Sequence, residues 1–342
     1  MRRKNGLKRN RASTEEKISA ILEKRMEQGI QQSELERLIT ISRSYCSELL
    51  SGMEKRRIIV RTKSGTSMRV FLTRYFPGLV NGIMRVGMLR SSEYLPLVST
   101  IMAFAEKFSV RLEIVPLDSV PEILRRLHVG SLDLAMAPSI PTISYGLLSG
   151  NIKVLGGIAS GGSAILSREG GCKNCVLTSA SSTMITMVAR TELPVEEMTV
   201  FTNPTHGIQQ FLAGNCCSIA IWEPYLTKLM DRPGIRVEST YSKLLDGFPC
   251  CVISTNVPFL AKNMQMLDDM MKTYWLDPVQ FLDKESGIEA TKIVGKMTRT
   301  GRNTLLRSLQ DYDFSRKDFG LGDMAALGIA MTREQQRELF HQ

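Results

Sequence analysis

Short runs of serine, threonine and glycine follow several predicted strands of this 342-residue chain. Such residues suit a small polar or anionic ligand, because hydroxyls and the free N–H groups at a helix N-terminus donate hydrogen bonds and the helix dipole favours negative charge. Helix capping is the alternative role for any one of them. The candidate ligand-binding residues of this kind are Ser139, Ser160, Gly161, Gly162, Ser163, Ser181, Ser182 and Thr183.

Aromatic and amide side chains extend this candidate site. Trp222 and Tyr225 are candidate aromatic walls, although a tryptophan at a strand end is equally common in a protein core. Asn203 follows the strand predicted over 198–201 and is a further candidate contact. No lysine or arginine stands beside these motifs as an obvious partner for a ligand, which disfavours a bare inorganic anion.

Seven cysteines offer a second kind of chemistry, metal binding or a thiol switch. Cys172 and Cys175 form a C-x-x-C motif in a predicted loop and are the candidate thiol or metal residues. A second C-x-x-C is lacking, so we expect neither a zinc ribbon nor any other cofactor. Two dipeptides lie in predicted strands, where adjacent side chains face opposite sides and buried cysteines act as small hydrophobic residues; they are Cys216-Cys217 and Cys250-Cys251.

The elements that position these residues begin beyond Pro77, where short apolar strands alternate with helical stretches. Strands are predicted over 84–89, 112–116 and 132–137, and helices over 97–108 and 120–128. Repeated strand-helix-strand units predict a parallel α/β sheet with helices on both faces. Ligands of such sheets bind beyond the carboxyl ends of the strands, which is where the serine and glycine runs lie.

Four segments carry a resemblance to a known family: 130–139, 148–164, 176–184 and 214–225, the last ending in Trp222-Glu223-Pro224-Tyr225. They are similar to the solute-binding components of nitrate, sulfonate and taurine importers and to their thiamine-pyrimidine relatives. The resemblance implies a type II periplasmic-binding-protein fold, with a ligand of one of these classes between two α/β lobes. It places lobe 1 at about 84–167 and 248–342 and lobe 2 at about 168–247, with crossovers near Ser167 and Gly247.

The positive charge is concentrated in the first 80 residues, which hold 18 of the 44 lysines and arginines but 8 of the 34 acidic residues. A basic N-terminal segment followed by a chain with no net charge predicts that the N-terminal segment contacts DNA. Helices are predicted from Ser13, Ser33 and Ser42, and a β-hairpin with a basic tip is predicted over 58–72. The third helix has a buried stripe at helical spacing: Cys46, Leu49, Leu50 and Met53.

This order of elements resembles the winged helix-turn-helix of MarR-like regulators. In that arrangement a helix reads base edges in the major groove and the wing contacts phosphates. A protein-interaction module with solvated charges is the alternative. The candidate DNA-binding residues are Arg43, Ser44, Ser47 and Glu48 on the helix, and Arg57, Arg61 and Lys63 on or beside the hairpin.

We therefore expect a basic arm at 1–12, a winged helix-turn-helix at 13–75, a linker at 76–83 and a two-lobe ligand-binding domain at 84–342. The arm either follows the DNA backbone or acts as a solubilising tail. No apolar run approaches the roughly 20 residues of a membrane span, and the first residues lack the apolar core of a secretory signal. These features predict a cytoplasmic protein with no membrane partner, in which the cysteines are reduced thiols.

Together these expectations describe a transcription regulator that binds double-stranded DNA as a homodimer and responds to a small-molecule effector. Two alternatives stay open. One is an enzyme of the thiamine-pyrimidine synthase type, which three histidines and the lack of a Cys-Cys-Cys-Phe-Cys motif make the weaker reading, so we expect no catalysis. The other is a DNA-binding protein with a vestigial clamp. The sequence identifies neither the ligand nor the direction of the response.

Overall fold

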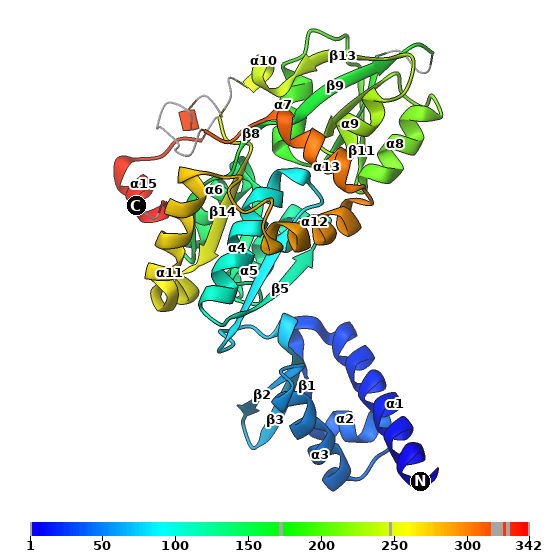
Figure 1. The fold of residues 1–342 in the computed structure, drawn as a ribbon, viewed down its shortest axis with the longest axis vertical. Coiled ribbons are helices and arrows are strands. Elements are labelled where there is room, and N and C mark those ends of the chain that lie inside the picture. The colour runs from blue at the N-terminus through cyan, green and yellow to red at the C-terminus, as the bar shows by residue number, and fades with distance from the viewer. Residues whose placement is uncertain (1, 171–173, 246–247, 316–323, 326–328, 341–342) are drawn as a thin grey trace. The chain divides into compact units, whose positions relative to one another are not determined.

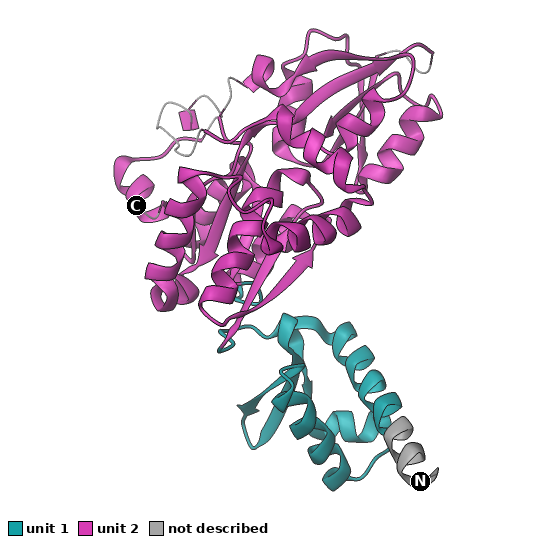
Figure 2. Cartoon of the chain, in the orientation of Figure 1, with its two compact units in different colours: residues 1–81, 129–132 teal, residues 82–128, 133–342 magenta. Residues whose placement is uncertain are grey.

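Two units make up the chain: residues 1–81 with 129–132, and residues 82–128 with 133–342 (Figure 2). The division falls inside the segment predicted as a linker. The computed structural model describes residues 2–170, 174–245, 248–315, 324–325 and 329–340, with side chains from residue 11 onward.

The N-terminal unit contains three helices and a small antiparallel sheet of order β1-β3-β2 (Figure 1). Its elements are α1 (Arg2–Arg25), β1 (Ile30–Gln31), α2 (Gln32–Ile39), α3 (Arg43–Lys55), β2 (Ile59–Ser64) and β3 (Ser67–Leu72), with 3-10 turns at Met26–Gln28 and Thr73–Tyr75. The predicted hairpin is present as β2 and β3, and β1 adds a strand that the sequence did not indicate.

The predicted boundary between a basic arm at 1–12 and a first helix at Ser13 is wrong, because α1 begins at Arg2. Arginine and lysine are good helix formers, so the basic segment continues the helix instead of preceding it. The prediction for α3 is confirmed. Its Ser42 hydroxyl accepts a hydrogen bond from the Tyr45 N–H at 3.3 Å, and the predicted stripe is buried.

Lobe 1 of the second unit is built on a five-stranded sheet of order β5-β4-β6-β14-β7. Strand β4 runs parallel to β5 and β6, whereas β14 runs antiparallel to both of its neighbours. The strands are β4 (Ile83–Met88), β5 (Arg111–Pro116), β6 (Leu134–Pro138), β7 (Ile152–Gly157) and β14 (Cys251–Asn256).

Lobe 2 has a second five-stranded sheet of order β11-β10-β12-β9-β13. Strand β10 runs parallel to β11 and β12, and β9 runs antiparallel to β12 and β13. The parallel arrangement predicted for the strands at 84–89, 112–116 and 132–137 is confirmed by β4, β5 and β6. Both sheets are nevertheless mixed, because β14 in lobe 1 and β9 in lobe 2 run antiparallel to their neighbours. The strands are β9 (Ser163–Arg168), β10 (Cys175–Ser179), β11 (Glu197–Phe201), β12 (Ser218–Trp222) and β13 (Ile235–Thr240).

Helices pack on both sheets (Figure 1). Those of lobe 1 are α4 (Leu95–Lys107), α5 (Val120–His128), α6 (Ser139–Ser149), α11 (Val257–Leu276), α12 (Glu285–Thr298) and α15 (Arg333–Leu339). Those of lobe 2 are α7 (Ser182–Ala189), α8 (Pro204–Leu212), α9 (Tyr225–Met230) and α10 (Tyr241–Leu245), and α13 (Arg302–Ser308) packs against both α9 and α12. Among the described residues, no helix combines the length and the apolar character that a membrane span needs.

The first crossover between the lobes lies at 158–162 and not near Ser167, which is buried inside β9. Here β8 (Ser160–Gly161) pairs with the late strand β15 (Tyr312–Asp313). Gly162 has φ +63°, and a Cβ atom there would lie 1.9 Å from the Tyr312 ring, so the crossover requires glycine. The return crossover ends at β14; the predicted crossover residue Gly247 lies outside the described residues.

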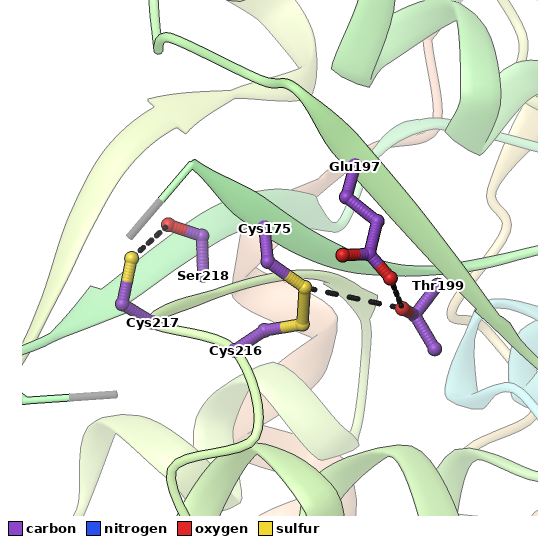
Figure 3. Close-up of a disulfide and its surroundings, with 6 residues drawn as sticks. All are labelled: Cys175, Glu197, Thr199, Cys216, Cys217 and Ser218. Atoms are coloured by element: carbon purple, nitrogen blue, oxygen red, sulfur yellow. Dashed lines mark hydrogen bonds between the residues drawn. A yellow bond between two sulfur atoms is a disulfide. The ribbon is translucent and has the colours of Figure 1, made fainter. Parts of the chain in front are cut away.

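A disulfide joins Cys175 at the start of β10 to Cys216 just before β12, with a Cα–Cα distance of 5.0 Å (Figure 3). The expectation that all cysteines are thiols is therefore wrong for this pair. The predicted grouping of Cys175 with Cys172 is also wrong for Cys175, because its sulfur is bonded to Cys216; Cys172 lies outside the described residues. The structure places Cys46, Cys217, Cys250 and Cys251 as free thiols.

A buried ion pair ties two neighbouring strands of lobe 1 together. The Arg85 side chain in β4 donates to both carboxylate oxygens of Asp133, just before β6, at 2.9 and 2.8 Å, and the Arg85 N–H donates to the same carboxylate at 2.8 Å. Both side chains are essentially inaccessible to solvent. Removal of one partner therefore leaves a buried charge without its counter-ion.

We expect Asp133→Asn to lower the free energy of unfolding by about 3–5 kcal/mol, because the Arg85 guanidinium loses its buried counter-ion. Chemical denaturation of the full chain measures this change. The matched control is Asp231→Asn, which breaks the exposed pair with Arg307 and should cost no more than about 1 kcal/mol. Equal stability of the two variants would contradict a structural role for the buried pair.

Candidate functional site

Two adjoining cavities lie in the two-lobe unit where the strand ends of the lobes meet. The smaller one, of about 70 Å³, is lined mostly by buried residues and is called the inner cavity. The larger one, of about 310 Å³, is lined mostly by half-buried and exposed residues and is called the outer cavity. Leu89 of lobe 1 and Ser179, Ser181 and Trp222 of lobe 2 line both. The cavities thus form one cleft with a narrow inner end, and this cleft is the candidate functional site.

The N-terminus of α7 supplies hydroxyl groups to the inner cavity. Ser181 is the N-cap residue, and Thr183, which is 4% exposed, lines the inner cavity. The hydroxyls of Ser182 and Thr183 are buried and make no hydrogen bond to any described residue. A buried hydroxyl without a partner is costly, and Thr183 lines the inner cavity, so its hydroxyl is available to a bound molecule. Of the predicted cluster, Ser181 and Thr183 thus lie at the cleft, whereas Ser182 lines neither cavity.

Trp222 of lobe 2 lines both cavities and also connects the two lobes across the cleft. Its indole Nε1–H donates to the carbonyl oxygen of Arg90 in lobe 1 at 2.9 Å. Tyr225 does not line either cavity. It is buried behind Trp222, with the two rings edge to face at 6.0 Å, because α9 turns its side chain into the core of lobe 2. The prediction that Tyr225 is a ligand wall is therefore wrong.

Of the remaining predicted ligand residues, one lines the cleft and the others do not. Ser163 lines the inner cavity. The others have roles in the fold that account for their side chains or their small size, and none of them lines either cavity. Ser139 donates to the Pro249 carbonyl at 2.6 Å, Asn203 caps α8 by accepting from the Thr205 N–H at 2.8 Å, and the first crossover contains Ser160, Gly161 and Gly162.

Arg90 is a cleft residue that the sequence reasoning missed. It follows β4 by two residues and lines the outer cavity, where its guanidinium contacts Asp118 at 2.6 Å and the Met297 carbonyl at 3.1 Å. Its position after a strand end was the available signal.

A second missed group lies at the inner end of the cleft: Glu93, Tyr94, Cys250 and Cys251, all buried. The Cys250 thiol donates to Glu93 Oε1 at 3.2 Å, and the Tyr94 hydroxyl lies 3.3 Å from Cys251 Sγ. The prediction that the two members of this dipeptide face opposite sides is wrong. Cys250 precedes the first residue of β14, so the alternation of a strand does not apply to it.

Burial dominates the titration of this group. It raises the pKa of the Glu93 carboxyl to about 7 and that of the Cys251 thiol to about 11. The hydrogen bond with Cys251 and burial both raise the pKa of Cys250 well above its ordinary value. Both thiols are thus protonated at neutral pH, whereas the Glu93 carboxyl titrates near neutral pH.

The predicted DNA-binding residues of the N-terminal unit differ in exposure and in their contacts with other side chains. Arg43, Ser44, Glu48, Arg57 and Lys63 are exposed, and Ser47 is half-buried. Glu48 pairs with Arg11 at 3.3 Å. The Arg61 guanidinium folds back on α3, where it contacts Glu54 at 2.6 Å and the Ser51 hydroxyl at 3.2 Å; its contact with DNA stays a prediction.

Comparisons of the sequence with protein-family models and with curated proteins found no match. Solved structures do match the fold. The alkanesulfonate-binding protein SsuA from Xanthomonas axonopodis pv. citri aligns with a TM-score of 0.56 at 16% identity, over 73% of this chain and 91% of that one. The SsuA protein from Escherichia coli aligns with a TM-score of 0.57 at 17% identity, over 72% and 85% of the two chains.

The nitrate-binding protein NrtA from Synechocystis PCC 6803 aligns with a TM-score of 0.52 at 13% identity, over 70% of this chain and 74% of that one. At such identities the likeness shows the fold alone. The two-lobe periplasmic-binding-protein-like fold implied by the sequence resemblance is therefore confirmed.

Glu223 of the Trp-Glu-Pro-Tyr motif holds the first crossover in place. Its N–H donates to the Gly162 carbonyl at 2.9 Å, and its buried carboxyl accepts from the Thr227 N–H at 3.0 Å and from the Thr227 hydroxyl at 2.7 Å. Burial and a hydrogen bond with Asp311 raise the pKa of Glu223 to about 8 from its ordinary 4.5.

A folded-state pKa of about 8 means that folding favours the protonated carboxyl. The Glu223 contribution to stability is therefore present below pH 4.5 and is lost as the pH rises towards 8. We expect Glu223→Gln to remove this dependence. Between pH 5 and pH 8 the free energy of unfolding of the wild type should therefore fall relative to that of the variant, by up to ~1.4 kcal/mol per pH unit, and its Tm should fall with it.

Thermal unfolding of both proteins over this pH range measures the effect. Glu289→Gln removes an exposed carboxylate and controls for net charge. Parallel Tm curves for wild type and Glu223→Gln would show that Glu223 does not titrate between the two states.

Proposed function

We propose that this chain is a DNA-binding transcription regulator whose two-lobe unit senses a small molecule in the interlobe cleft. The observation that carries the proposal is the buried, unpartnered hydroxyl of Thr183, a residue that lines the inner cavity of the cleft. A folded protein rarely leaves such groups without a partner, and a ligand that accepts hydrogen bonds would satisfy them.

The cleft suits a small molecule with a polar or anionic end. The N–H groups and dipole at the start of α7 favour negative charge, and the outer cavity of about 310 Å³ is of the size that small-molecule sites have. Solved relatives of the fold are named for alkanesulfonate and nitrate binding. We therefore propose a sulfonate, nitrate, taurine or thiamine-pyrimidine ligand, bound without catalysis.

The proposed DNA-binding part is the N-terminal unit as a winged helix-turn-helix. Three helices are followed by an antiparallel hairpin, and α3 presents Arg43 and Ser44 at its exposed N-terminal end. None of the described residues pairs with Arg43 or Lys63, so both are free to contact DNA. The excess of positive charge in the first 80 residues supplies the non-specific part of the affinity.

Regulation would follow from lobe closure. A ligand that binds the closed form more tightly than the open one shifts the population towards closure. We propose that closure changes the spacing between the two N-terminal units of a homodimer, since regulators of this kind bind paired half-sites on DNA. A DNA partner implies a cytoplasmic location, where the Cys175–Cys216 disulfide would meet reducing conditions.

We expect Thr183→Val to reduce the Tm rise that a ligand produces, because the variant keeps the shape of the side chain and loses the hydroxyl. Without ligand its Tm should not fall, since the hydroxyl has no partner in the free protein. A thermal-shift screen of the full chain against sulfonates, nitrate, taurine, thiamine and its pyrimidine precursors measures both effects.

Thr186→Val is the matched control, because the Thr186 hydroxyl donates to the Ser182 carbonyl at 2.8 Å one turn further along α7. Its ligand response should remain that of the wild type. An unchanged response in Thr183→Val would place the ligand away from α7. A wild-type protein that responds to none of the compounds would favour the vestigial clamp.

We expect Arg43→Ala to weaken binding to duplexes that the wild-type chain selects from a random pool, by about 5- to 150-fold, because a bidentate base contact is lost. Lys63→Ala should weaken selected and unselected duplexes alike and should lower the salt dependence by about one unit of slope. Fluorescence anisotropy at several salt concentrations separates the two effects.

Lys292→Ala is the control, since Lys292 is exposed on the two-lobe unit and pairs with Glu289. Selected-duplex affinity that is equal in Arg43→Ala and Lys292→Ala would remove α3 as the reading helix. A wild-type chain that enriches no duplex would overturn the DNA-binding proposal itself.

A further inference from the structure

Three metal-ligating side chains converge at the inner end of the cleft. A carboxylate oxygen of Glu93 and the sulfurs of Cys250 and Cys251 all lie within 4.8 Å of one another, and all three residues are buried. They come from two elements far apart in the sequence: the 3-10 turn Ser92–Tyr94 after β4, and the entry to β14. The fold brings these two elements together where the return crossover ends at β14.

The cluster lacks a positive charge. Among the residues that the structure describes, no lysine or arginine forms an ion pair with Glu93, although its side chain is only 3% exposed. Its hydrogen bonds come from the neighbouring cysteines and from the Ala159 backbone. A buried carboxylate is normally paired or bound to a metal. Two cysteine sulfurs lie beside it, so a bound cation would satisfy all three groups once each thiol has given up its proton to bind the ion.

We propose that Glu93, Cys250 and Cys251 bind a thiophilic divalent cation of the Zn²⁺ class. Two sulfur ligands and one oxygen ligand select such an ion over Mg²⁺ or Ca²⁺, which prefer oxygen alone. Metal–sulfur bonds of about 2.3 Å and metal–oxygen bonds of about 2.1 Å require ligand atoms within about 4 Å of one another, which small side-chain rotations from the observed cluster reach. Each thiol releases its proton to solvent as its sulfur binds the ion.

Three protein ligands leave the fourth position of a tetrahedral ion open. The three residues line the inner cavity of about 70 Å³, so that position faces the space in which a small donor group fits. The Tyr94 hydroxyl, 3.3 Å from Cys251 Sγ, is placed to orient that sulfur as a positioning residue. The ion would thus lie in the cleft, in contact with whatever molecule enters it.

The direct test is a titration of the reduced full-length chain with Co²⁺, whose thiolate complexes absorb by charge transfer, followed by displacement with Zn²⁺. We expect one equivalent of Co²⁺ to bind with this absorbance. Cys250→Ser and Cys251→Ser should each abolish the charge-transfer band or shift it strongly, and Glu93→Gln should weaken binding by at least about 10-fold.

Two controls address the other thiols of the chain. Cys217→Ser removes a half-buried thiol beside Ser218, and the double variant Cys175→Ser, Cys216→Ser removes the disulfide sulfurs. Both should bind Co²⁺ as the wild type does. Uptake that these controls abolish, or that survives in Cys250→Ser and Cys251→Ser, would overturn the assignment, as would a reduced wild-type chain that takes up no Co²⁺.

X-ray absorption of the wild-type chain loaded with one equivalent of Zn²⁺ tests the site without any variant that could misfold. We expect about two sulfur neighbours at about 2.3 Å. A shell of oxygen and nitrogen only, or of four sulfurs, would contradict the proposal. Metal uptake is measured here without DNA or an organic ligand, so its outcome is independent of the proposed regulatory function.

Discussion

The backbone pairing of β14 is the interaction on which the two-lobe unit depends. This strand returns from lobe 2 and inserts between β6 and β7, so the lobe 1 sheet is complete only after lobe 2 has been formed along the chain. Every residue of β14 is buried, and the Thr255 hydroxyl adds a bond to the Asp133 carbonyl at 2.9 Å. The insertion brings both crossovers to one place, and the cleft residues come from these crossovers and from the strand ends beside them.

Polar groups concentrate at this junction because strands end there, and several of them are buried without an ion-pair partner among the described residues. Glu93 and Glu223 are both buried, and the pKa values of both are raised by burial. The hydroxyls of Ser182 and Thr183 have no partner among the described residues. A molecule or ion that binds the folded form and satisfies such groups would stabilise it by mass action. The proposed ligand response and the proposed metal site therefore depend on the same arrangement of buried polar groups.

The sequence predicted this arrangement where local rules hold and failed where the path of the chain decides. Helical spacing identified the buried stripe of α3, and strand-end position identified Ser163, Thr183 and Trp222. The direction in which a strand crosses between lobes is not a local property, so the parallel run β5-β4-β6 was predicted but the antiparallel strands β9 and β14 were not. The pairing of Glu93 with Cys250 depends on where β14 begins, and side-chain periodicity gives strand boundaries only to within a few residues.

We propose that occupancy of the cleft changes DNA binding by the N-terminal unit. The most direct measurement is the affinity of the full chain for one duplex, by fluorescence anisotropy, with and without a compound shown by calorimetry to saturate the cleft. The account predicts a difference of about 5- to 150-fold, together with the same factor in the affinity for the compound when DNA is present. Equal DNA affinities with the cleft empty and saturated would contradict it.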